Sequence, residues 1–331
     1  MSGEIEIKRI PKLNLGRFPT PMYELARLGG ALGRRILVKR DDLSGVSTGG
    51  NKVRKLEYLL YDAVDQGADI VLTTGGAQSN HAMLTAACCN MLCLEAMLVL
   101  KGRGVMGRAG NLMIDELLGA EVRFVDTDSY GDVYAEMARI EDGLRAKGRR
   151  PYHIPVGGSV PLGTLGYVDC AREIFSDALE AGVKIDRIVC TAGSGGTMAG
   201  LLLGALLYGD GCRVTGVAVD DGPFEDVVAE LVNGAAELLG RGDVHISASD
   251  ADVYPCFGAG YARPSKAGLE AIRLAAKTEG LILDPVYTGK TMAGLVEMCG
   301  NGKIGAHETV VFLHSGGIAS VFAIDPADIV E

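Results

Sequence analysis

Gly49-Gly50-Asn51-Lys52-Val53-Arg54-Lys55 is the stretch from which the rest of this chain can be interpreted. Its two glycines end an irregular run and let the backbone come close to a flat or bulky group. Apolar residues then recur at the spacing of an amphipathic helix, at Leu56, Leu59, Leu60 and Val64. Lys52 is therefore predicted on the first helical turn, where the helix dipole disfavours its ammonium form. A lysine that loses its proton easily is a nucleophile for aldehydes, although a solvated lysine near a helix start fits the same stretch.

Short apolar runs alternate with helical patterns along most of the remaining chain. After the first helix, strands are predicted at 70–73, 95–100 and 122–125, and helices at 79–89, 107–118 and 133–146. A second run begins near residue 155, with strands at 187–190, 214–219 and 310–313 and helices at 163–181, 196–207, 224–239, 265–278 and 289–298. Regular strand–helix alternation predicts an α/β fold with mainly parallel sheets flanked by helices.

The composition narrows the possible partners of this 331-residue chain. A formal net charge of −10 and the absence of Trp argue against a nucleic acid or an anionic membrane as partner. Eight cysteines without a CxxC pair favour a reducing cytoplasm, with neither a disulfide framework nor a metal site. Residues 1–6 carry no apolar signal core, and Asn90 and Glu95 interrupt the longest apolar stretch, so no signal peptide or membrane span is expected.

The segment Ala192-Gly193-Ser194-Gly195-Gly196-Thr197 follows a predicted strand and opens a predicted helix. This arrangement offers backbone N–H groups and a helix dipole to an anion such as phosphate, although an ordinary glycine-rich turn has the same composition. Met198 stands where a dinucleotide fingerprint needs glycine, so NAD is not favoured. A later segment ends in Gly-Lys-Thr, but Asp284 and Pro285 replace the start of a Walker A loop, so ATP is not expected.

Five blocks occur in a fixed order between about Thr20 and about Phe322: GGNKVRKLEYLL, GGAQSNH, AGSGGTMAGL, DPVYTGK and LHSGG. Together they resemble the pyridoxal-phosphate enzymes of fold type II, which are similar to the tryptophan synthase β-subunit. The branch that they resemble contains D-cysteine desulfhydrase, 1-aminocyclopropane-1-carboxylate (ACC) deaminase and L-cysteate sulfo-lyase. The resemblance implies a large cofactor-binding domain of residues 1–52 plus 161–331 and a small inserted domain of residues 53–160. Pyridoxal 5'-phosphate would lie in the cleft between them.

The resemblance also implies roles for the first three blocks. Lys52 would hold the cofactor covalently, and residues 192–197 (Ala192, Gly193, Ser194, Gly195, Gly196 and Thr197) would bind its phosphate. Gln78, Ser79 and Asn80 would bind the substrate carboxylate. Asn80 would also bond the phenolic oxygen of the cofactor, and Ser79 would move protons. From the residues alone, Ser79 is better explained as a cap of the helix that follows it.

The resemblance implies further site residues in the second half of the chain. Tyr261 and Tyr287 would line the active site, with Tyr287 in substrate binding or proton transfer. Ser315 is the predicted partner of the pyridine nitrogen, with Thr288 as the other candidate. A hydroxyl partner leaves that nitrogen largely neutral, which suits the loss of a β-leaving group. His81 and His314 are interpreted as packed neighbours.

These expectations lead to a lyase that releases pyruvate and ammonia from a small amino acid, with D-cysteine as first substrate. L-Cysteate is the leading alternative, because Arg263 and Lys266 enter a loop beside Tyr261 and one of them could bind a sulfonate. ACC is a weaker alternative, since relatives that open its ring have Glu where this chain has Thr288. A non-catalytic homologue that binds the cofactor is a further alternative, disfavoured by the intact Lys52, Ser79 and Tyr287. A homodimer is also expected, in the cytoplasm that the cysteines favour.

Overall fold

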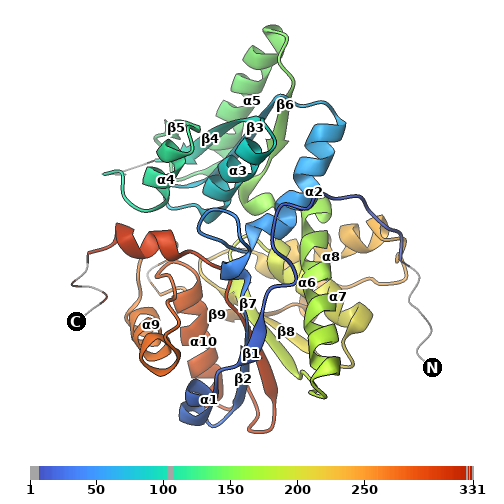
Figure 1. Cartoon of the computed structure of the whole chain (residues 1–331), viewed down its shortest axis with the longest axis vertical. Coiled ribbons are helices and arrows are strands. Elements are labelled where there is room, and N and C mark those ends of the chain that lie inside the picture. Colours follow the sequence, from blue (N-terminus) through green and yellow to red (C-terminus); the bar gives the residue numbers. More distant parts are fainter. Residues whose placement is uncertain (1–6, 103–106, 259, 326, 328, 330–331) are drawn as a thin grey trace.

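The computed structural model describes residues 7–102, 107–258, 260–325, 327 and 329. Two sheets, one above the other in Figure 1, each carry helices on both faces. The predicted α/β fold with mainly parallel sheets flanked by helices is therefore confirmed. The prediction about residues 1–6 falls outside the described residues. Within the described residues, no helix is long and apolar enough to cross a membrane.

The larger sheet has six strands in the order β1-β2-β10-β7-β8-β9. Only β1 runs antiparallel to its neighbour; the other pairs are parallel. Its central strands are buried along their whole length and consist mostly of apolar residues, as expected of a sheet covered on both sides. Their bounds are β1 (Met22–Glu24), β2 (Arg35–Lys39), β7 (Arg187–Ala192), β8 (Arg213–Ala218), β9 (Asp252–Pro255) and β10 (Thr309–Leu313).

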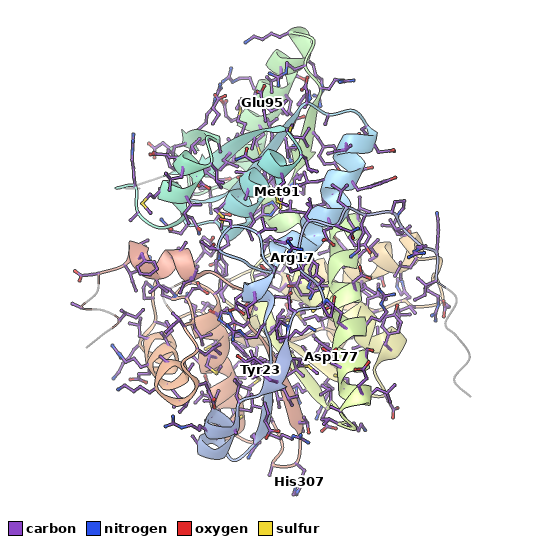
Figure 2. The ribbon with its side chains drawn as sticks, in the orientation of Figure 1. Arg17, Tyr23, Met91, Glu95, Asp177 and His307 are labelled. Carbon is purple, nitrogen blue, oxygen red and sulfur yellow. The ribbon has the colours of Figure 1, made fainter. Side chains whose placement is uncertain are left out.

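The smaller sheet has four parallel strands in the order β5-β4-β3-β6. Figure 2 labels Glu95 in this upper sheet and His307 in the loop below the larger one, at opposite ends of the molecule. Arg17 lies near the junction of the two parts in the same view, where its backbone N–H donates to Ser44 O at 2.8 Å. The strand bounds are β3 (Ile70–Gly76), β4 (Glu95–Lys101), β5 (Glu121–Val125) and β6 (Pro151–Ile154).

The helices divide between the faces of the two sheets (Figure 1). One apolar core joins the larger sheet to α6, α7 and α8, and a second joins its other face to α1, α9 and α10. The smaller sheet packs against α2, α3 and α4 on one face and α5 on the other. The bounds are α1 (Ala26–Leu32), α2 (Lys52–Asp65), α3 (Asn80–Met91), α4 (Asn111–Leu117), α5 (Tyr130–Ala146), α6 (Pro161–Glu180), α7 (Gly196–Tyr208), α8 (Phe224–Leu238), α9 (Lys266–Glu279) and α10 (Thr288–Gly300), with short 3-10 turns η1 (Asp41–Leu43), η2 (Val156–Gly158), η3 (Ala248–Asp250) and η4 (Ile318–Ala323).

The structure corrects the predicted secondary structure in two respects. The helix expected at 107–118 begins only at Asn111, because Gly107 and Gly110 adopt positive φ angles of 87° and 63° that a helix interior does not accept. Strands β1, β6 and β9 were missed because they are only three or four residues long and lie at or beside sheet edges. Two of them also contain Pro, which weakens a strand pattern in the sequence.

The loop before α2 joins the two sheets. Gly49 has φ +74°, and an added Cβ there would lie 1.8 Å from Asp42 O, so only glycine fits. Gly50 forms an isolated antiparallel bridge with Gly316, just beyond the end of β10. These contacts hold the start of α2 against the carboxyl end of the larger sheet. The two sheets fall in the two predicted domains, but the boundaries near residues 52 and 160 stay a prediction.

Candidate active site

A cavity of about 430 Å³ lies at the carboxyl ends of strands from both sheets. This volume falls within the roughly 300–1,000 Å³ of small-molecule sites, and the position is where α/β sheets bind ligands. Its lining includes strand ends from the smaller sheet, strand ends from the larger sheet and the first turns of α2, α3 and α7. The site residues predicted from sequence that line it are Lys52, Ser79, Asn80, Gly193, Ser194, Gly195, Thr197, Tyr261, Tyr287 and Ser315.

Lys52 is the first residue of α2, as the sequence pattern predicted. Its Nζ donates to Asn51 Oδ1 at 3.0 Å. Burial lowers the pKa of Lys52 to about 8, although the Asp284 carboxylate pulls it upward. The predicted direction is therefore correct, but burial rather than the helix dipole is the main cause. An amine with this pKa is partly unprotonated near neutral pH and can attack a carbonyl carbon.

Asn51, to which sequence reasoning assigned no role, connects three segments at the cavity. Its Nδ2 donates to Thr197 Oγ1 at 3.0 Å, and its backbone N–H donates to Ser315 O at 3.0 Å. The starts of α2 and α7 and the end of β10 are thereby held together. Nothing in its local sequence indicates this, since both contacts depend on residues more than 140 positions away.

The first turn of α7 lines the cavity through Gly193, Ser194, Gly195 and Thr197. Helix N-termini bind anions through free N–H groups and the helix dipole. Ser159, also in the wall, lies 2.9 Å from Ser194 Oγ through its hydroxyl and accepts from the Gly196 N–H at 3.2 Å. Ala192, which precedes the turn, and Gly196, which lies within it, do not line the cavity.

Lys55 lies buried behind this turn. Its Nζ donates to Gly157 O at 3.1 Å and to Ser159 Oγ at 3.2 Å. Burial lowers the pKa of Lys55 well below its usual value, and the nearby Lys52 lowers it further. An anion at the α7 start would favour the charged form of Lys55, so this lysine adds to the anion-binding character of the turn.

Ser79 and Asn80 form the start of α3 and face the cavity. The Ser79 hydroxyl accepts from the Ala82 N–H at 3.2 Å, so this serine caps the helix and lines the site at once. Gln78 does not line the cavity. Its amide instead donates to Ala109 O at 3.0 Å and accepts from the Asn111 N–H at 2.9 Å. The predicted substrate contact of Gln78 therefore has no support in the geometry.

Two tyrosines meet on one wall of the cavity. The hydroxyls of Tyr261 and Tyr287 lie 2.5 Å apart, and the two rings are arranged edge to face. Burial raises the pKa of both hydroxyls, that of Tyr287 far above its usual value. Both tyrosines therefore stay protonated at neutral pH and can donate a hydrogen bond or deliver a proton.

Other lining residues had no recognisable signal in the sequence. Tyr130 and Tyr134 come from the first turns of α5, and Lys101 from the end of β4, with its Nζ 4.1 Å from the Tyr130 ring centroid. Asp220 and Asp221 follow β8 on the opposite sheet. The fold thus brings aromatic and charged side chains to the site from elements far apart in the chain.

Ser315 and Thr288 differ in position, although both were candidates for the same role. Ser315 follows β10 and lines the cavity. Thr288 is fully buried, is not part of the lining, and uses its hydroxyl locally: Oγ1 donates to Asp284 Oδ1 at 2.7 Å and accepts from the Asp284 N–H at 2.8 Å. The geometry therefore favours Ser315 over Thr288 as a ligand-facing hydroxyl.

The two histidines have protein partners. His81 Nε2 lies 2.9 Å from Thr73 Oγ1, and His314 Nε2 donates to Ile282 O at 3.0 Å. Burial lowers the pKa of both rings, so both are neutral at physiological pH. His81 is in the cavity wall, whereas His314 is not in the lining.

The predicted sulfonate-binding cations lie away from the cavity. Arg263 is exposed, and Lys266 is 92% exposed with only a 3.9 Å contact to Glu270. Neither belongs to the lining. Nearness to Tyr261 in the sequence therefore does not bring either cation into the cavity wall. Lys101, at the end of β4, is a lysine of the lining besides Lys52.

The comparisons with known proteins cover nearly the whole chain. Residues 13–316 match the family described as pyridoxal-phosphate dependent enzyme. A Pyrococcus horikoshii protein, provisionally named 1-aminocyclopropane-1-carboxylate deaminase, is 40% identical over 320 residues, which are 96% of this chain and 94% of that protein. D-Cysteine desulfhydrase of Salmonella typhi is 38% identical over 330 residues, which are 97% of this chain and 98% of that protein.

Two solved structures extend the comparison. The crystal structure of an ACC deaminase homologue has a TM-score of 0.88 and 40% identity, covering 95% of this chain and 94% of that one. Threonine deaminase isoform 2 of Solanum lycopersicum has a TM-score of 0.64 and 17% identity, covering 90% of this chain and 79% of that one. The second likeness concerns the fold alone.

Proposed function

This chain belongs to the family of pyridoxal-phosphate dependent enzymes, and from that premise we propose that it eliminates the β-substituent of a small amino acid, giving pyruvate and ammonia. D-Cysteine, which loses sulfide, is the first substrate. The observation that carries the proposal is the contrast between the two candidate hydroxyls. Ser315 lines the cavity, whereas Thr288 stands where ring-opening relatives have Glu and uses its hydroxyl on Asp284.

The residues of the cavity fit pyridoxal phosphate. Lys52 supplies a nucleophilic amine, the α7 start an anion site, Asn80 an amide and Ser315 a hydroxyl for a ring nitrogen. When bound, the cofactor withdraws electrons from Cα of the substrate amino acid and stabilises the carbanion left there. A neutral hydroxyl at the ring nitrogen limits this withdrawal compared with a carboxylate, which would favour the protonated nitrogen. That balance suits the loss of a good β-leaving group.

The chain's own groups supply the proton transfers. Lys52, with a pKa of about 8, would be able to take a proton from Cα of the substrate. Tyr287 is protonated and can give a proton to departing sulfide. Ser79 lies at the start of α3 within the same cavity and is a second group able to relay a proton. The N–H groups at the α7 start would hold the phosphate of the cofactor.

The test is a substrate panel assayed on the purified protein loaded with cofactor. D-Cysteine, L-cysteine, L-cysteate, β-chloroalanine and ACC are supplied in turn, and pyruvate, 2-oxobutyrate, sulfide and sulfite are measured. We expect pyruvate and sulfide from D-cysteine and little or no 2-oxobutyrate from ACC. Efficient conversion of ACC would overturn the proposal and support the activity named for the Pyrococcus relative.

A second candidate, L-cysteate sulfo-lyase activity, is favoured by one feature of the cavity. Lys101 is part of the cavity wall, and its Nζ donates to Asp128 O at 3.3 Å and lies 4.1 Å from the Tyr130 ring centroid. From this position it could bind a sulfonate in place of the exposed Arg263. Lys101→Met and Arg263→Ala, each assayed on L-cysteate and D-cysteine, separate the alternatives. A selective loss of cysteate turnover in Lys101→Met supports this activity, and no cysteate turnover by the parent protein excludes it. The cytoplasmic location and the homodimer both stay predictions. Sedimentation can test the homodimer.

A further inference from the structure

Asn80 reaches the cavity from the first turn of α3, but a residue outside the cavity sets which side of its amide faces inward. Asn111, the first residue of α4, donates from its Nδ2 to Asn80 Oδ1 at 2.7 Å. The same Nδ2 donates to the backbone carbonyl of Gln78 at 3.0 Å. Asn111 is fully buried and does not line the cavity.

The backbone carbonyl of Gln78 fixes this arrangement. The orientation of an amide follows from its hydrogen-bond network, and a carbonyl oxygen only accepts. Asn111 must therefore present its nitrogen to Gln78 O, because its own oxygen there would repel. The same nitrogen also donates to the Asn80 amide, so Asn80 must present its oxygen to Asn111. The order of donors and acceptors is thus set from the main chain outward.

Asn80 Nδ2 is left as the group available to the cavity. Among the described residues it has no hydrogen-bond partner, and it is not among their enclosed, unpartnered polar atoms. A Cβ built at Gly317 would lie 3.0 Å from this nitrogen, so glycine leaves it room. The site therefore receives a hydrogen-bond donor at this point rather than an acceptor.

The same arrangement leaves one buried acceptor, Asn111 Oδ1, unsatisfied. Within the described part of the chain, Asn111 Oδ1 is buried without a hydrogen-bond partner. Such an orphaned acceptor is unfavourable, and turning the amide would not relieve it without opposing Gln78 O. The Asn111 N–H is itself held by Gln78 Oε1 at 2.9 Å. The residue is thus fixed at its backbone and its side chain together.

We propose that Asn111 is a positioning residue, which holds Asn80 so that its N–H₂ donates to an anionic oxygen of the bound cofactor or substrate. This inference rests on the proposed function, because it takes the ligand from there. A donor at an ionisable oxygen favours its anionic form. Without the brace from Asn111, the Asn80 amide is free to turn its carbonyl inward and oppose the same oxygen.

The test uses Asn111→Ala and Asn111→Asp, with Asn90→Asp as matched control. Asn90 also joins α3 to α4, since its Nδ2 donates to Leu118 O at 2.8 Å, but it is exposed and lies at the far end of both helices. Measurements are the pyridoxal-phosphate dissociation constant and the pH midpoint of the visible absorption of the protein-bound cofactor. Loss of one charge-assisted hydrogen bond predicts binding about ten- to a hundredfold weaker and a midpoint about one pH unit or more higher.

A double-mutant cycle separates positioning from a general loss of packing. In an Asn80→Ala background, Asn111→Ala should change neither quantity further. The proposal is overturned if Asn111→Ala matches the parent, if Asn90→Asp moves the midpoint equally, or if the shift persists without Asn80. A parent protein with no visible band on adding pyridoxal phosphate would instead contradict the proposed function itself.

Discussion

Lys52 and Arg54 stand two residues apart on the first turn of α2, yet their surroundings are opposite. Arg54 is 2% exposed and contacts Asp41 and Glu173 at 2.8 Å each. Burial opposes its charge, but these carboxylates outweigh burial and raise the pKa of Arg54. Within the described part of the chain, Lys52 Nζ has the Asn51 amide oxygen as its hydrogen-bond partner, and burial lowers its pKa to about 8 against the pull of the Asp284 carboxylate.

This difference shows how one helical turn serves two purposes. The Arg54 face attaches α2 to η1 and α6, with Tyr167 donating a further hydrogen bond to Asp41. Its charge is permanent and its partners are satisfied. The Lys52 face places an amine beside a cavity, where it can lose its proton. Among the described residues no carboxylate forms an ion pair with it, although Asp284 acts on it from a greater distance. The contacts of Arg54 therefore fix the helical turn that carries Lys52.

The largest expected effect comes from removing the reactive cation. Lys52→Ala should lower turnover of the D-cysteine substrate roughly a thousandfold or more, because both the attachment group and the proposed base are lost. The fold should persist, since no ion pair is broken. Lys277→Ala on the exposed face of α9 is the control, with turnover expected to be unchanged. Turnover by Lys52→Ala within tenfold of the parent would contradict the role given to Lys52.

The next largest effect is expected from removing the structural cation, Arg54. Arg54→Met leaves Asp41 buried without its partner, which predicts a loss of about 3–5 kcal/mol in the free energy of unfolding. Denaturant unfolding measures it. The double variant Arg54→Met with Asp41→Leu should recover part of the loss, because neither charge is then stranded. If the double variant is as unstable as the sum of the two single variants, the ion pair does not act as a unit.

The two cations should also differ in how stability depends on pH. In the unfolded chain Lys52 has its usual pKa of 10.5, against about 8 in the fold. Between these values the unfolded state binds more protons, so the free energy of unfolding rises with pH, by about 3 kcal/mol at most. Below pH 8 the destabilising contribution is fully present. Cofactor-free parent protein should show this rise between pH 8 and 10.5 relative to Lys52→Met; identical profiles would contradict the lowered pKa.

The smallest effect is expected at Arg263. Its side chain is exposed and outside the cavity, so Arg263→Ala should change turnover of D-cysteine and L-cysteate by less than about twofold. Steady-state kinetics on both substrates measure this. A selective loss of cysteate turnover greater than tenfold would restore the loop after Tyr261 as a sulfonate site and would require it to fold inward.

The features that could be predicted from the sequence are those formed by residues close together in the chain. The glycines before Lys52 and the strand–turn–helix at residues 187–207 are local, so their geometry follows from neighbouring residues. Ser79 shows that two interpretations can hold together, because it caps α3 and lines the cavity. The α/β alternation followed from the same local patterns, since apolar strands and amphipathic helices are both visible in short windows.

The rest of the site depends on tertiary contacts, which a short stretch of sequence does not reveal. Asn51, Lys101 and Tyr130 reach the cavity only when the two sheets come together. The role of Asn111 depends on a helix that starts four residues later than predicted. Arg263 was misplaced for the opposite reason, because closeness to Tyr261 along the chain does not fix the direction of a side chain.

The contrast between Lys52 and its neighbours can be tested most directly by finding where the cofactor attaches. Purified protein loaded with pyridoxal phosphate is reduced with borohydride, digested and mapped by mass spectrometry. The account predicts loss of the visible band and a phosphopyridoxyl group on the peptide that contains Lys52, at Lys52 itself. A label on Lys55, Lys101 or any other lysine, with Lys52 unmodified, would contradict it.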